Sequence, residues 1–114
     1  MRVLITSLSM LLPTAALAFE PVTDRGTFLA IVTGKQLTGE DTALIVSDGG
    51  AITGRTGGVD VTGDWTWEGE YFCRTLESAL LDIAPDCQTV GVQGDVVRFR
   101  ADRGTGDALD LTLR

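Results

Sequence analysis

The side chains that could do chemistry in this chain are carboxylates and two cysteines. The 114 residues include 16 Asp and Glu, one lysine (Lys35), one tyrosine (Tyr71) and no histidine. Without histidine there is no Ser–His or Cys–His catalytic pair, and the commonest metal ligand is missing. Two carboxylates can hydrolyse a glycoside, but no pair of acids stands out by its spacing. We therefore assign no catalytic residue, no cofactor and no metal site, and keep a small carboxylate enzyme only as an alternative.

Two glycine-rich segments and one acidic loop are further candidates for ligand binding. Gly49-Gly50 and Gly54-Arg55-Thr56-Gly57-Gly58 lack the G-x-G-x-x-G spacing that cradles a dinucleotide, so a reductase finds no support in them. The segment from Asp102 to Asp107 carries two acids, but Arg103 lies between them and the acid spacing of an EF-hand is absent. We interpret the glycines as turn residues and the acidic segment as a solvated loop.

The two cysteines, Cys73 and Cys87, do not have the Cys-x-x-Cys spacing of a catalytic redox pair. In an exported protein a lone pair of cysteines is more often a disulfide than two free thiols. A bond that closes a loop of about fifteen residues contributes about 3 kcal/mol by restricting the unfolded chain. We predict a disulfide between Cys73 and Cys87.

Export itself is predicted from residues 1–18. Arg2 precedes a mostly apolar stretch, Pro13 interrupts it, and Ala16-Leu17-Ala18 has the small-x-small pattern that signal peptidase accepts. The apolar stretch of about ten residues is half of the roughly twenty that span a bilayer. We predict a signal peptide over residues 1–18 and a single β-rich domain over 19–114. After cleavage the domain would be periplasmic or secreted, without a stable membrane span.

The elements that position these residues follow from local patterns. Thr23 or Asp24 can cap a short helix from Arg25 to Val32, which Gly34 ends. Runs of β-branched and aromatic residues then alternate with turn signals. We expect strands at 35–38, 42–46, 51–56, 59–62, 70–76, 87–92, 96–101 and 107–113, and a loop or single helical turn at 77–83. About eight short strands in sequential hairpins predict a mainly β fold, an antiparallel meander that is strongly curled or closed into a small β-barrel plugged by the N-terminal helix.

The densest group of large side chains lies at residues 63–73. Trp65 and Trp67 share one face of a regular strand, and Tyr71 and Cys73 share a face after the following turn. In one interpretation the rings pack on the disulfide and cover one end of the core. In the other, Trp65, Trp67 and Tyr71 line a pocket mouth or a partner-binding patch. The remaining polar side chains are expected to face solvent: Thr66, Glu68, Glu70 and Arg74.

The same segment carries a resemblance. The pattern G-D-W-T-W-E-G-E-Y-F-C at 63–73, followed by a second cysteine and by G-D-V-V-R-F-R at 94–100, resembles a group of small exported proteins of alphaproteobacterial type. This Gram-negative group has no established activity and no catalytic motif, so the resemblance implies no site residue. A weaker likeness is to periplasmic inhibitor proteins, which are small disulfide-bonded β-barrels that block proteases or lysozymes.

The charge of the chain bears on its partners. A formal net charge of −7 argues against nucleic acid and anionic membranes. We expect a non-enzymatic β domain that binds another periplasmic protein or an envelope component, and the oligomeric state stays open. The alternative binder is a lipocalin-like barrel that holds a small apolar ligand. Large inward residues such as Phe28, Trp65, Trp67 and Phe99 predict a filled interior, so a cavity of several hundred Å³ would favour this alternative.

Overall fold

The structure is a computed structural model that describes residues 18–114. The predicted signal peptide, apart from Ala18, lies outside the described residues. Within residues 18–114, no helix is both long enough and apolar enough to cross a bilayer.

The described chain begins with a short strand and a helix. Strand β1 (Glu20–Val22) precedes helix α1 (Arg25–Val32), and the helix has the predicted bounds. Asp24 caps it, since its carboxylate accepts hydrogen bonds from the Thr27 backbone N–H and from the Thr27 hydroxyl, both at 2.8 Å. The backbone bond from Thr27 is the main reason why the pKa of Asp24 lies below its ordinary value. The cap places Phe28 and Val32 on the buried side of the helix.

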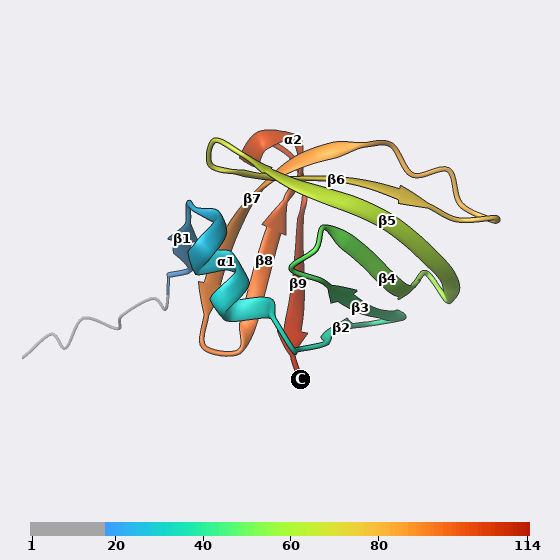
Figure 1. The fold of residues 1–114 in the computed structure, drawn as a ribbon, viewed down its shortest axis with the longest axis horizontal. Coiled ribbons are helices and arrows are strands. Elements are labelled where there is room, and N and C mark those ends of the chain that lie inside the picture. Colours follow the sequence, from blue (N-terminus) through green and yellow to red (C-terminus); the bar gives the residue numbers. More distant parts are fainter. Residues whose placement is uncertain (1–17) are drawn as a thin grey trace, which may run out of the picture.

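Eight antiparallel strands form a closed barrel (Figure 1). Each strand pairs with the next along the chain, and the first of the eight closes on the last. The predicted mainly β meander is therefore confirmed, and the sheet closes fully rather than only curling. The short β1 is an extra strand that pairs with β7. The barrel strands are β2 (Leu37–Gly39), β3 (Thr42–Val46), β4 (Ala51–Thr56), β5 (Val59–Glu68), β6 (Tyr71–Glu77), β7 (Asp86–Gln93), β8 (Val96–Arg100) and β9 (Ala108–Leu113).

Closure depends on the pairing of β2 with β9. Thr38 lies opposite Thr112, and its hydroxyl donates to the Thr112 carbonyl at 3.1 Å. Beyond the strand ends, the backbones of Gln36 and Arg114 exchange two hydrogen bonds of 2.9 Å each. These bonds occupy the edges that an open sheet would expose to other chains.

Two inward-facing glycines on neighbouring strands allow the sheet to bend into a small barrel. Gly54 of β4 has φ 144°, and a Cβ at this position would collide with the Ala43 carbonyl oxygen. A Cβ at Gly63 of β5 would collide with the Thr75 carbonyl oxygen in the same way. Side chains here would push the adjacent strands apart, so both positions require glycine.

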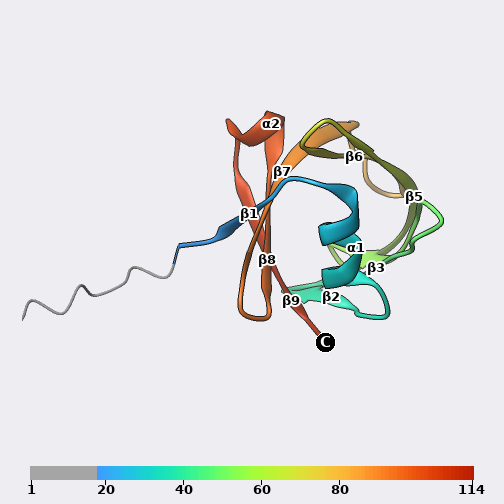
Figure 2. The same cartoon turned by 60° about the vertical axis from the view of Figure 1, so that its left-hand side comes forward.

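Helix α1 lies inside the ring of strands and closes one end of the barrel (Figure 2). Phe28 is 0 % exposed, and its ring centroid lies 5.1 Å from that of Phe72, 5.3 Å from Trp67 and 5.5 Å from Trp65. The expected helical plug is therefore present, and it gathers the largest rings of the chain at its own end of the barrel.

The other end of the barrel is formed by the β2–β3 and β4–β5 turns, the β6–β7 loop and the β8–β9 connection. In Figure 1 the β4–β5 turn and the β6–β7 loop project away from α1. Residues 78–85 form this loop without a helical turn, because β6 and β7 pair only between Phe72–Arg74 and Asp86–Gln88 and then separate. The predicted polar loop before β9 contains the short turn α2 (Ala101–Gly104), in which Asp102 and Arg103 have left-handed backbone conformations with φ of 53°.

Candidate functional site

The three aromatic residues selected from the sequence are not brought together on one surface. Strands β5 and β6 pair so that Trp67 lies opposite Phe72 and Glu68 lies opposite Tyr71. Because side chains alternate between the faces of a strand, Trp65 and Trp67 point into the barrel and Tyr71 points out of it. A single patch of Trp65, Trp67 and Tyr71 is therefore not present.

The two tryptophans are part of the core. Trp65 is 4 % exposed, and its indole N–H donates to the Ser47 carbonyl at 2.8 Å. Trp67 is partly buried, packs against the core and donates to the Gly69 carbonyl at 2.9 Å. Each indole thus contacts Phe28 with its ring and satisfies its polar N–H through a turn at the closed end. This arrangement corresponds to the packing interpretation, except that the rings lie inside the barrel and the disulfide lies outside.

Cys73 and Cys87 form the predicted disulfide on the outer face. They lie directly opposite each other on β6 and β7, with their Cα atoms 3.9 Å apart. Glu68 approaches the Cys87 sulfur at 4.0 Å, so these three residues have the proximity of metal ligands. Sulfur binds a metal as a thiolate, and bonded sulfurs are not thiolates, so this cluster is not a metal centre. A disulfide of this kind is typical of proteins outside the reducing cytoplasm.

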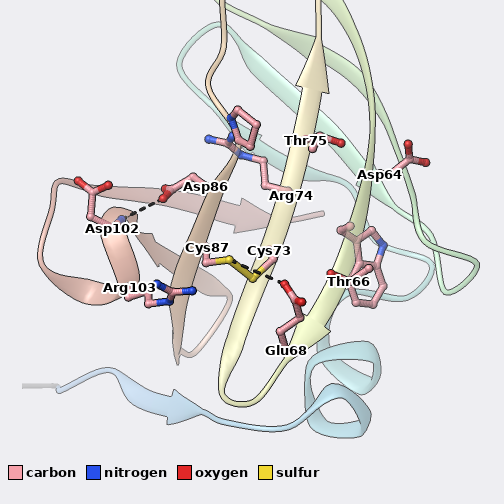
Figure 3. Close-up of a pocket in the computed structure, with 12 residues that line it drawn as sticks. Asp64, Thr66, Glu68, Cys73, Arg74, Thr75, Asp86, Cys87, Asp102 and Arg103 are labelled. Atoms are coloured by element: carbon pink, nitrogen blue, oxygen red, sulfur yellow. Dashed lines mark hydrogen bonds between the residues drawn. A yellow bond between two sulfur atoms is a disulfide. The ribbon is translucent and has the colours of Figure 1, made fainter.

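A groove of about 580 Å³ crosses the disulfide on the outer surface (Figure 3). Among the described residues, no ion pair joins its charged side chains to one another. Asp86 accepts a hydrogen bond from the Asp102 backbone N–H at 3.1 Å, and the guanidinium of Arg103 lies 5.6 Å from the Tyr71 ring. Figure 3 shows Asp64 directed away from the disulfide. The groove is open and lacks a convergent pair of carboxylates, so it is a weaker candidate site than the barrel interior.

The barrel interior contains a cavity of about 330 Å³ in the half that α1 does not occupy. The prediction of a filled interior is therefore wrong for this half of the barrel. The wall of the cavity is predominantly aliphatic and aromatic. Its deep part is formed by Leu37, Leu44, Val46, Ile52, Phe99 and Leu111.

The cavity reaches solvent between the β4–β5 turn, the β6–β7 loop and the start of β9. Leu109 faces inward from β9 opposite Phe99, yet it is 50 % exposed. Leu81 of the β6–β7 loop lines the cavity and is 39 % exposed, and the adjacent Leu80 is 76 % exposed. We call Leu80, Leu81 and Leu109 the apolar rim. An apolar molecule would meet this rim before it enters the cavity.

Three polar side chains, Thr56, Arg74 and Gln88, also line the cavity, and Arg74 lines the outer groove as well. Arg74 was expected to face solvent, and this expectation is wrong, because it pairs in register with Trp65 on the inward face of β6. Its guanidinium donates to the Ala84 carbonyl of the β6–β7 loop at 2.8 Å. Burial lowers the pKa of Arg74, against the opposing effect of the nearby Asp86 carboxylate. An arginine remains charged at neutral pH all the same, so the cavity wall contains one cation.

Sequence reasoning missed these cavity residues, although a signal for two of them existed. Arg74 lies between Phe72 and Leu76 in a period-two pattern, and Gln88 precedes Val90 in the same way. Residues two apart on a strand share a face, so both polar residues had to point inward with their apolar neighbours. For Leu81 and Ile83 of the loop there was no such periodic signal.

The fold and the cavity define a class of protein: a small antiparallel β-barrel, in which consecutive strands are neighbours, with an interior cavity open at one end. Barrels of about eight strands are those that either fill with side chains or hold one small ligand. Comparisons with protein-family models, curated proteins and solved structures find no match to this chain.

Proposed function

We propose that this protein binds a small, largely apolar molecule inside its barrel, outside the cytoplasm. The observation that carries the proposal is the cavity of about 330 Å³, which is lined mainly by apolar side chains and is open beside the apolar rim. Small-molecule sites are concave, predominantly apolar and contain a few placed polar groups. The barrel interior meets each of these conditions better than the outer groove does.

The volume of the cavity limits the size of the ligand. An engineered protein cavity of roughly 150 Å³ holds benzene. A cavity about twice as large would hold a molecule of about ten to twelve non-hydrogen atoms, such as a short alkyl chain or a two-ring compound. Long-chain lipids would not fit entirely inside.

The expected affinity follows from the apolar surface that the ligand would bury. Burial of ten methylene groups contributes about 8 kcal/mol, and association costs at least about 4 kcal/mol. The difference of about 4 kcal/mol corresponds to a dissociation constant of about 1 mM. Apolar contacts alone would therefore give weak binding, and tighter binding would need a polar contact.

Location outside the cytoplasm is supported by two features. The Cys73–Cys87 disulfide is typical of an oxidising compartment, and residues 1–18 have the pattern of a signal peptide. We propose the periplasm or the exterior as the place of function. Binding of a partner protein or an envelope component, which the sequence suggested, remains a separate hypothesis without a structural feature in its favour.

A pair of variants at the mouth of the cavity tests the proposal. Leu109 points inward and is half-exposed, so Leu109→Trp would block the entrance with little cost to folding. The neighbouring Ala108 is exposed and faces the opposite side of β9, so Ala108→Trp is the matched control. The probe is 1-octanol, titrated while amide chemical shifts are followed by NMR.

We expect 1-octanol to shift the amides of residues in the deep wall, such as Leu44 and Leu111, with a dissociation constant of about 1 mM. Leu109→Trp should weaken this binding at least about tenfold, and Ala108→Trp should leave it unchanged. Thermal unfolding checks that both variants fold. The proposal is refuted if 1-octanol fails to shift these amides up to its solubility limit, or if both variants bind alike.

A further inference from the structure

We propose that the cavity selects an anionic amphiphile, a short alkyl chain with a carboxylate or similar head group, and that Arg74 binds the head group. This inference rests on the proposed function and names its ligand class. The cavity has an apolar wall and a single cationic side chain. A ligand that matches both features has an apolar body and one negative charge.

The first support is the position of Arg74 in the wall. It extends from the inward face of β6, flanked on that face by Phe72 and Leu76. Its bond to the Ala84 carbonyl places the guanidinium against the β6–β7 loop, the segment that also carries Leu80 and Leu81 of the apolar rim. A head group bound there would remain near solvent while its alkyl chain extends toward the deep wall and Phe99.

The second support is that the guanidinium lacks a carboxylate partner. The ion pairs among residues 18–114 are Arg55–Asp60 and Arg98–Asp110, both on the outer surface. The hydrogen bond to Ala84 is the one that Arg74 makes within the described chain, although a guanidinium has five N–H donors. Arg98, in contrast, holds Asp110 with two hydrogen bonds of 2.7 and 2.9 Å. Arg74 thus has the donors for the same forked geometry but no acceptor of that kind.

The nearest acid, Asp86, does not take this role. One of its oxygens accepts a hydrogen bond from the Gln88 side-chain amide at 2.9 Å, and the other accepts from the Asp102 backbone N–H at 3.1 Å. Both carboxylate oxygens of Asp86 therefore already accept hydrogen bonds, one from a side chain of β7 and one from the backbone of α2. Arg74 remains a half-buried cation, and its desolvation is offset only in part, by the charge of Asp86, which lies opposite it on β7 without forming an ion pair. A ligand carboxylate would supply the missing partner, and arginine is well suited to it because its fork matches the two oxygens.

The overall charge of the chain does not itself favour an anionic ligand. The chain has a formal net charge of −7, so its long-range field repels anions. A preference for an anionic over a neutral ligand must therefore come from Arg74 itself.

The experiment compares octanoate, 1-octanol and octylamine, which share the chain and differ in head group. Each is titrated against the wild-type protein, Arg74→Gln and Arg55→Gln, with the cavity amides followed by NMR. Arg55→Gln is the matched control, because it removes the same charge from an exposed site on the outer surface. Hydrogen bonds to a charged group correspond to about a ten- to hundredfold gain in binding.

We expect the wild-type protein to bind octanoate about ten- to a hundredfold more tightly than 1-octanol, and octylamine more weakly than either. Arg74→Gln should remove most of the octanoate advantage and change 1-octanol binding by less than about threefold. Arg74→Lys, which keeps the charge but loses the fork, should retain part of the advantage. Arg55→Gln should leave all three dissociation constants unchanged.

The alternative is that Arg74 only holds the β6–β7 loop through Ala84. Arg74→Gln would then weaken octanoate and 1-octanol by the same factor, and that result would overturn the inference. Equal binding of octanoate and 1-octanol by the wild-type protein would also overturn it, while the proposed function would stand. If neither compound shifts the cavity amides, both proposals fail. Thermal unfolding of each variant verifies that it folds.

Discussion

Truncation of Phe28 tests whether α1 is part of the barrel core. Phe28 is fully buried and contacts four aromatic rings, three of them within 5.5 Å and Phe99 at 6.4 Å between centroids. Phe→Ala substitutions in cores cost about 3–5 kcal/mol. The rings around Phe28 come from three different strands of a closed barrel, so they cannot collapse freely into the space left by its side chain. We therefore expect Phe28→Ala to lower the free energy of unfolding by about 4 kcal/mol.

Urea denaturation followed by tryptophan fluorescence measures this loss, because Trp65 and Trp67 are both in contact with the ring that is removed. With a slope of about 1.5 kcal/mol per molar urea, 4 kcal/mol moves the midpoint by about 2.7 M. Total stability of small domains is about 5–15 kcal/mol, so the variant retains at most a modest margin. The control is Ile45→Ala, a truncation on the outer face of β3 where the side chain is half-exposed; it should cost less than about 1 kcal/mol. If Phe28→Ala costs no more than Ile45→Ala, α1 is not a structural plug and the reasoning is refuted.

Two further predictions concern the disulfide and the response to acid. Replacement of both Cys73 and Cys87 by serine should lower the free energy of unfolding by about 3 kcal/mol; reduced wild-type protein should lose the same amount in urea denaturation, and an undiminished midpoint would contradict the prediction. The pKa values of Asp24 and Asp110 are held below the ordinary 3.8, chiefly by the Thr27 backbone N–H and by the Arg98 side chain respectively. Because the folded-state pKa is the lower one, this stabilisation is present above about pH 4 and is lost as the pH falls through the depressed values. Asp24→Asn keeps the helix cap but should flatten the dependence of unfolding free energy on pH between about 5 and 2, and an unchanged slope would count against the assignment.

Local elements of this fold could be predicted because their signals lie within a few residues of one another. The helix from Arg25 to Val32 follows from the capping residue Asp24 and the glycine at 34, where φ is 74°. The strands follow from alternation bounded by turn residues. The sequence did not show whether the sheet closes into a barrel. Closure depends on contacts such as the hydrogen bond between Thr38 and Thr112, which are 74 positions apart in the chain. No local sequence pattern specifies a strand partner that far along the chain. The pairing of β2 with β9 results from packing of both strands on the same core.

The candidate site could be predicted only in part. The disulfide followed from the number of cysteines and the expected compartment, and the structure contains it. The tryptophans were recognised as a dense segment, but the side of the sheet that they face was not resolved. Arg74 was placed on the wrong face because its charge was given more weight than its position between Phe72 and Leu76. Alternation along β6 was the stronger signal, since a strand cannot turn one side chain without turning its neighbours.

The sequence by itself determined the class of fold, the helix, the order of the strands and the pairing of the two cysteines. Only the tertiary structure decided that the barrel contains a cavity. A count of large inward residues suggests a full interior, but it does not say where along the barrel those residues lie. Trp65, Trp67 and Phe72 pack around Phe28 at the closed end of the barrel. The opposite end then has mainly aliphatic side chains, with Phe99, Arg74 and Gln88, around about 330 Å³ of space. The distribution of volume along the barrel axis depends on strand register and on the depth of the helix, and neither is encoded by a local pattern.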